Sequence, residues 1–183
     1  PCLDQVNYLA GGLRNMAVNR SKGIAVTVVV VLLGGIGSLG HSGVFGDLFR
    51  KSPAESAKAA GVVETADAVM IPLKSLDTGK ALFLSMESEG RKLYYFALKS
   101  RDGAYRAALD TCDVCFRTNR GYRQEGDQMV CNNCGQTFAC DRIGEVKGGC
   151  NPHPLAHKEE AGVMVIRKAD IVAGKEYFAR KRP

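Results

Sequence analysis

The sequence lacks the residue patterns on which the common classes of enzyme depend. No serine, histidine and aspartate stand in a triad arrangement, and there is no glycine-rich phosphate-binding loop or pair of catalytic carboxylates. These absences disfavour triad hydrolases and nucleotide-binding enzymes. They leave catalysis undecided and favour a non-catalytic electron-transfer or metal-binding subunit.

Charge is absent from one long stretch. The residues from Gly23 to Gly46 include no Asp, Glu, Lys or Arg. About 20 apolar residues span a bilayer as a helix, and a buried helix of a soluble protein normally carries a polar face. The run therefore predicts one transmembrane helix over 23–46. Its apolar core is longer than that of a cleaved signal peptide, which indicates a signal anchor.

Basic residues on each side of this run bear on its orientation. Arg14, Arg20 and Lys22 precede it, which predicts a cytoplasmic N-terminus and a C-terminal domain outside the cytoplasm, anchored in the inner (cytoplasmic) membrane. Arg50 and Lys51 follow the run and argue against that orientation. The remaining charge excess, +6 overall, is scattered apart from a basic cluster at 180–182. We interpret that cluster as a solvated tail and expect no nucleic-acid partner.

Flanking segments divide the chain further. Apolar residues at steps of three and four over 1–22 predict an amphipathic helix on the membrane or a partner, although Gly11 and Gly12 also fit a frayed leader. Residues 47–66 are expected to be a tether that holds a short helix at 54–60, capped by Ser52 and Pro53. The extracytoplasmic domain follows over 67–183.

Small residues recur every four positions in the second half of the apolar run, at Gly34, Ser38, Ser42 and Gly46. Such a stripe lets another helix approach closely. It predicts that helix 23–46 binds other subunits of a membrane redox or iron-transport complex as well as lipid. The alternative is that the glycines mark a loosening helix end. His41, near the outer edge, is better suited to a polar interface than to haem.

The soluble part reads as mainly β. Short aromatic and β-branched runs alternate with glycine-bearing turns, which predicts a small antiparallel sheet. The expected strands are 68–73, 81–86, 93–98, 105–109 and 162–166, and segments 170–172 and 176–178 close the fold.

Six of the seven cysteines fall between positions 112 and 150, and four of them form two Cys-x-x-Cys pairs, Cys112/Cys115 and Cys131/Cys134. Two such turns facing each other place four thiolates around one metal, as in zinc-ribbon or rubredoxin-like knuckles. Residues 121–130 read as a β-hairpin that brings the second pair beside the first. Gly135 follows directly and suits the positive φ of a metal-binding turn. Disulfides or thiol exchange are the competing interpretation.

The remaining cysteines leave two alternatives. Cys150, between Gly149 and Asn151, is either a ligand, alone or together with Cys140, or a disulfide partner of Cys140. His153 and His157 lie on the same loop, and imidazole suits zinc, copper or iron. Each is more often a surface histidine, but beside Cys150 His153 is a candidate ligand.

These motifs together carry a resemblance to a known family. Asp110-Thr111-Cys112-Asp113-Val114-Cys115-Phe116, Val130-Cys131-Asn132-Asn133-Cys134-Gly135 and Gly148-Gly149-Cys150-Asn151-Pro152-His153 follow an N-terminal membrane segment. This order resembles the membrane iron–sulfur-containing FtrD-like family, over roughly residues 66–180. The resemblance implies an extracytoplasmic metal-thiolate domain in electron transfer. It also implies that Cys112, Cys115, Cys131, Cys134 and Cys150 are the cofactor-binding positions and that Cys140 is an addition.

Three functions follow from these patterns. The first is a membrane-anchored electron-transfer subunit that holds iron or an iron–sulfur cluster. The second is a structural zinc module in an accessory or assembly subunit. The third is a protein that delivers metal to a permease through Cys140, Cys150 and the histidines.

Overall fold

The structure is a computed structural model that describes residues 52–183. The expected amphipathic segment 1–22, the transmembrane helix 23–46 with its small-residue stripe, and His41 lie outside the described residues. Within 52–183, no helix has both the length and the apolar character that crossing a membrane requires.

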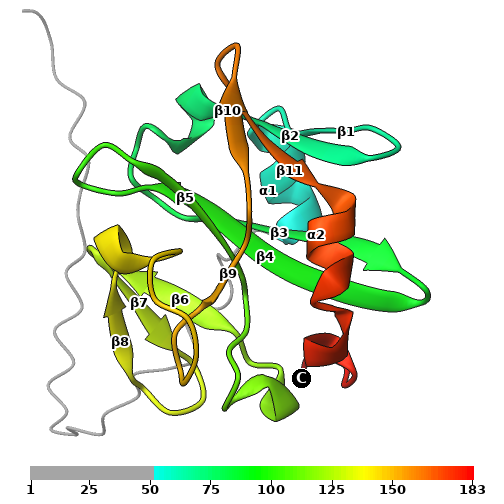
Figure 1. Ribbon diagram of the computed structural model, residues 1–183, viewed down its shortest axis with the longest axis vertical. Coiled ribbons are helices and arrows are strands. Elements are labelled where there is room, and N and C mark those ends of the chain that lie inside the picture. The colour runs from blue at the N-terminus through cyan, green and yellow to red at the C-terminus, as the bar shows by residue number, and fades with distance from the viewer. Residues whose placement is uncertain (1–51) are drawn as a thin grey trace, which may run out of the picture. The chain divides into compact units, whose positions relative to one another are not determined.

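Strands dominate the described residues (Figure 1). They are β1 (Val63–Glu64), β2 (Ala68–Pro72), β3 (Leu82–Ser88), β4 (Arg91–Lys99), β5 (Tyr105–Leu109), β6 (Tyr122–Glu125), β7 (Gln128–Cys131), β8 (Thr137–Ala139), β9 (His153–Pro154), β10 (Lys158–Glu160) and β11 (Val163–Arg167). The α-helices are α1 (Pro53–Ala59) and α2 (Lys168–Ala173), and short 3-10 turns occupy Leu73–Leu76, Phe116–Thr118, Cys140–Arg142 and Lys175–Phe178. The closing segments 170–172 and 176–178 therefore fall in α2 and in the last 3-10 turn.

Helix α1 begins at the residues that the sequence indicated. The Ser52 hydroxyl accepts from the Glu55 backbone N–H at 3.2 Å, and the Glu55 carboxylate accepts from the Ser52 N–H at 3.0 Å. This capping box, with Pro53 in the first turn, satisfies backbone donors that the helix cannot pair itself. Ala57, within the expected tether range 47–66, packs against the main hydrophobic core.

Pairing within 52–183 produces three antiparallel sheets, where the sequence analysis expected one. Their strand orders are β1-β2-β11-β10, β3-β4-β5-β9 and β6-β7-β8. The single-sheet expectation is wrong because β2 pairs with the distant β11, Ile71 opposite Met164, and not with β3. Alternation of apolar residues identifies strands, but it does not say which strands pair.

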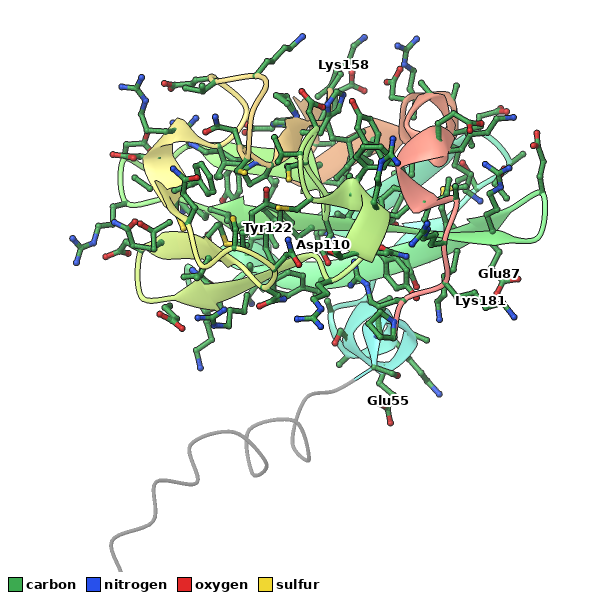
Figure 2. All side chains as sticks on the ribbon, turned by 90° about the horizontal axis from the view of Figure 1, so that it is seen from below. Glu55, Glu87, Asp110, Tyr122, Lys158 and Lys181 are labelled. Atoms are coloured by element: carbon green, nitrogen blue, oxygen red, sulfur yellow. The ribbon has the colours of Figure 1, made fainter. Side chains whose placement is uncertain are left out.

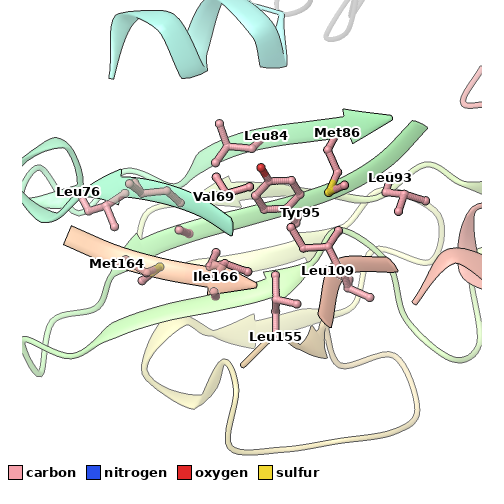
Figure 3. Packing of buried hydrophobic residues seen from close by; sticks show 14 of the residues in the cluster. Val69, Leu76, Leu84, Met86, Leu93, Tyr95, Leu109, Leu155, Met164 and Ile166 are labelled. Carbon is pink, nitrogen blue, oxygen red and sulfur yellow. The ribbon is translucent and has the colours of Figure 1, made fainter. Parts of the chain in front are cut away.

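Strand β4 is buried on both faces and separates two clusters of side chains. Tyr95 and Ala97 point to one side and join the core shown in Figure 3, between the two four-stranded sheets. Phe96 and Leu98 point to the other side and pack with cysteine-bearing segments and Tyr122. This period of two follows from the pleat of a strand. The sheet β3-β4-β5-β9 is thus the middle layer on which the cysteine region rests.

Candidate metal centre

Two tight turns deliver the Cys-x-x-Cys pairs. Cys112 follows the end of β5 by three residues, and Cys115 immediately precedes the 3-10 turn Phe116–Thr118. The hairpin expected over 121–130 is present as β6 and β7, and it places Cys131 opposite Tyr122. Gly135 has φ +75°, as expected, and its N–H donates to the Cys131 carbonyl at 2.9 Å. The sequence prediction of the hairpin and of its glycine turn is confirmed.

Cys150 reaches the same place by a different route. The two-residue strand β9 pairs with the end of β5, with His153 opposite Leu109, and the His153 N–H donates to the Thr111 carbonyl at 3.0 Å. The buried Tyr122 hydroxyl donates to the Cys150 carbonyl at 2.5 Å. The loop that bears Cys150 is therefore held beside both Cys-x-x-Cys turns.

Five sulfurs converge as a result. The Sγ atoms of Cys112, Cys115 and Cys150 all lie within 4.8 Å of one another, and so do those of Cys115, Cys131 and Cys134. Cys115 belongs to both groups, so its sulfur lies within 4.8 Å of the other four. The two groups also meet at the Cys134 and Cys150 sulfurs, which are 3.9 Å apart. For comparison, four sulfurs bound to one zinc at about 2.3 Å lie about 3.8 Å apart.

All six cysteines within 52–183 are free, so the Cys140–Cys150 disulfide, one of the two alternatives, is not formed. Cys140 is buried in the apolar cluster behind β4, and its sulfur lies 4.0 Å from the Gln124 side-chain nitrogen. It belongs to neither sulfur group.

The candidate histidines also lie apart from the sulfur groups. The His153 ring packs against Tyr177 in a tilted arrangement, with 5.0 Å between centroids, and its Nδ1 is 3.7 Å from the Asp113 carboxylate. His157 Nε2 is 3.0 Å from the Tyr105 carbonyl oxygen. Which of all these residues bind a metal stays a prediction.

Burial favours the protonated form of three of the five converging thiols in the metal-free chain. It raises the pKa of Cys115 and of Cys150 to about 11 and that of Cys131 to about 12. Cys134 is exposed, and a hydrogen bond from the Gln136 backbone lowers its pKa. Metals bind the thiolate form, so binding here releases protons and displaces the S–H form that burial favours.

Hydrogen-bond donors compensate part of this cost. The Cys115 N–H donates to the Cys112 sulfur at 3.1 Å, and the Asn133 side-chain amide donates to the Cys115 sulfur at 3.3 Å. Donors of this kind stabilise the negatively charged thiolate and tune the potential of a bound iron centre.

Asp110, two residues before Cys112, connects the first Cys-x-x-Cys turn to the start of β6. This contact was not predicted from the sequence. The Asp110 carboxylate accepts from the Tyr122 N–H at 2.6 Å and pairs with Arg182 at 2.8 Å (Figure 2 shows Asp110 beside Tyr122). A Cβ at Gly121 would lie 2.5 Å from this carboxylate, so the close approach requires glycine. The interpretation of 180–182 as a solvated tail is wrong for Arg182, whose guanidinium also lies 3.7 Å from the Tyr94 ring centre. A single Asp before a Cys-x-x-Cys pair gives no indication in the sequence of an ion-pair partner 72 residues further along the chain.

The space beside the sulfurs is small. A cavity of about 10 Å³ lies next to Cys112, Cys115 and Cys131, which is no larger than one water molecule. The donor set of five free thiols fits a thiophilic metal such as iron or zinc.

A family model described as "Membrane iron-sulfur containing protein FtrD-like" matches residues 76–178, more than half of the chain. The chain belongs to this FtrD-like family. All five converging cysteines lie inside the matched range, and membership together with their grouping supports a metal-binding membrane protein. The family description names an iron–sulfur cofactor, in agreement with the resemblance noted from the motifs.

Other comparisons add little to this assignment. The chain is similar to a solved structure of the quaternary ammonium Rieske monooxygenase CntA in complex with an inhibitor, at 18% identity and a TM-score of 0.30. The similarity covers 46% of this chain and 26% of the other, so the chain spans about a quarter of that protein. No curated protein matches the sequence.

Proposed function

We propose that this FtrD-like protein is an electron-transfer subunit that holds iron, as a single ion or an iron–sulfur cluster, within a membrane redox or iron-transport complex. The observation that carries the proposal is the convergence of five free cysteine sulfurs on Cys115 from three separate segments. Iron bound by thiolates supplies a one-electron couple whose potential responds to hydrogen bonds and burial.

The chain's own residues divide the work around such a centre. Cys112 and Cys131 are 1% and 2% exposed and keep water from its inner side. Cys134 is exposed and provides an edge that a partner can approach.

The proposal places this domain outside the cytoplasm on a single helix at 23–46, which also contacts the partner subunits. Support comes from the absence of charge between Gly23 and Gly46, the basic residues before it, and the membrane assignment of the family.

A structural zinc site is the second candidate. The strands around the sulfurs are short, with three residues in β8 and four each in β6 and β7. Zinc bound by thiolates would add the stability that such a small sheet lacks. Metal delivery has less support, because Cys140, His153 and His157 lie apart from the sulfur groups.

Elemental analysis and visible absorption of the full chain, purified without oxygen, test the proposal. We expect iron and a thiolate-to-iron absorption band. Zinc in place of iron, with no absorption in the visible, would overturn the electron-transfer function and favour the structural one, since zinc has no redox chemistry.

Two matched variants locate the centre. Cys131→Ala and Cys140→Ala each remove a buried thiol, 2% and 4% exposed, from the same apolar cluster. We expect Cys131→Ala to lose the metal and its absorption, and Cys140→Ala to keep both. Retention of full metal content by Cys131→Ala would contradict the proposed ligand set.

A further inference from the structure

Two of the converging sulfurs touch each other at the open edge of the site. Cys134 Sγ lies 3.9 Å from Cys150 Sγ, about the sum of two sulfur radii. Cys134 is exposed and Cys150 is half-buried, whereas Cys112 and Cys131 are buried. A dissolved oxidant therefore reaches this edge before it reaches the inner sulfurs.

The number of sulfurs exceeds what one thiolate centre needs. A four-coordinate zinc or iron ion takes four cysteines, and so does a common iron–sulfur cluster. Five lie together here. A fifth thiol in contact with a ligand sulfur can compete with the metal for it.

We propose that Cys134 and Cys150 form a reversible disulfide, and that this bond and the metal exclude each other. The exclusion rests on the proposed metal centre, whereas formation of the bond does not. A disulfide consumes two of the five sulfurs and leaves three, fewer than a four-coordinate centre requires.

The backbone around both residues permits the necessary approach. An S–S bond is about 2.0 Å long, so the sulfurs must close by about 2 Å. Both residues lie in turns, next to glycines with positive φ, Gly135 at +75° and Gly149 at +61°. Apart from the flanking residues, no atom lies within 4 Å of where a Cβ would sit on either glycine, so no other segment packs against the turns at these positions. Cys131, by contrast, is buried and held by strand pairing with Tyr122.

A small-molecule disulfide of the glutathione type supplies the oxidant. The Cys134 thiolate attacks one sulfur of this disulfide, forms a mixed disulfide and releases one small thiolate. The Cys150 thiolate then attacks Cys134 Sγ and releases the second. Two cysteine thiols are oxidised, one external disulfide is reduced to two thiols, and the two protons pass to those thiols.

Peptide mapping tests whether the bond forms. The full chain is stripped of metal with a chelator, treated with oxidised glutathione and digested with trypsin without reductant. Cleavage after Arg142 and Lys147 separates peptide 124–142 from peptide 148–158, which contains Cys150. We expect these two peptides to be joined, two hydrogens lighter than their sum.

Matched variants assign the partner, since peptide 124–142 contains three cysteines. The link should persist in Cys140→Ser and vanish in Cys134→Ser. Cys134 is exposed, so its replacement leaves the packed core intact, and circular dichroism checks this. Glutathione adducts without a link, or a link that survives in Cys134→Ser, would overturn the proposal.

Zinc uptake tests the exclusion. Zinc binding by the oxidised chain should fall at least tenfold and return after treatment with dithiothreitol. Equal uptake before and after oxidation would refute the exclusion. These measurements use no iron and no spectrum of the purified protein, so their outcome is separate from that of the electron-transfer function.

Discussion

The two four-stranded sheets and the cysteine layer are held together in different ways. The body, defined as the sheets β1-β2-β11-β10 and β3-β4-β5-β9, surrounds a core of aliphatic side chains and Tyr95 and includes the nine-residue strand β4. The cysteine layer, defined as β6-β7-β8 with the loops 110–121 and 140–152, has strands of three or four residues. Apolar burial can stabilise the body, whereas so small a sheet needs specific ties.

These ties include aromatic, polar and charged contacts. Phe96 of the body packs edge-on against Tyr122, and Tyr122 packs edge-on against Phe138, with centroid distances of 6.4 and 6.2 Å. Asp110 adds a charged link to Arg182 at the C-terminus. The sulfur cluster is a further tie within the layer. The comparison implies that the layer depends on bound metal far more than the body does.

Removal of the metal should show the largest difference in stability between the body and the cysteine layer. We expect the amides of β6, β7 and β8 to lose protection from hydrogen exchange by about a thousandfold or more on chelation, because metal-binding energy is folding energy in a small metal site. Amides of β4 and β11 should change much less. Equal loss in both regions would show that they fold as one cooperative unit and would end the distinction.

Asp110→Asn should break the charged tie between them. The carboxylate is 2% exposed in its side chain, and its loss removes the negative charge that pairs with the Arg182 cation, whose side chain is 22% exposed. Loss of one partner from a buried ion pair costs about 3–5 kcal/mol. Denaturant unfolding measures this cost. Asp77→Asn is the control, because Asp77 pairs with Lys99 at a half-exposed site, where loss of an ion pair should cost much less. An equal effect of the two changes would contradict the role given to Asp110.

Ile166→Ala tests the body alone. Ile166 is fully buried on β11 in the main core (Figure 3), and truncation of such a side chain costs about 3 kcal/mol through lost burial and the remaining cavity. We expect a lower free energy of unfolding with unchanged metal stoichiometry in the folded protein. Loss of metal from this variant while it remains folded would mean that core packing positions the sulfurs directly.

Local patterns predicted much of this architecture. Several predicted features depend only on neighbours in the sequence and are present: the strand 105–109, the hairpin 121–130, the turn at Gly135 and the capped helix near 54–60. The two Cys-x-x-Cys turns face each other for the same local reason. Turn chemistry and side-chain alternation are sufficient for such features.

Local patterns did not predict which segments far apart in the sequence pair with each other. Strand β9 has two residues and no alternation to detect, yet it carries Cys150 to the site. From the residues alone Cys150 stayed either a ligand or a disulfide partner of Cys140, and only the family resemblance implied that it is a cofactor-binding position. The Asp110–Arg182 pair and the division into three sheets likewise depend on partners far apart in the chain.

Tyr122→Phe should have the smallest effect on stability of these changes. It tests one contact within the cysteine layer, the hydrogen bond from Tyr122 to the loop that bears Cys150. The ring keeps its packing on Phe96 and Phe138, but the Cys150 carbonyl loses its donor at 2.5 Å. Loss of one such hydrogen bond costs about 1 kcal/mol. Because the bond holds the loop that bears Cys150, alkylation of Cys150 in the metal-free chain should quicken severalfold.

Tyr105→Phe is the matched control for this change, since the Tyr105 hydroxyl donates to Asp77 in the body at 3.1 Å. It should leave the alkylation rate of Cys150 unchanged. If both variants raised that rate equally, the effect would reflect general loosening of the domain, and Tyr122 would have no special part in holding the fifth sulfur.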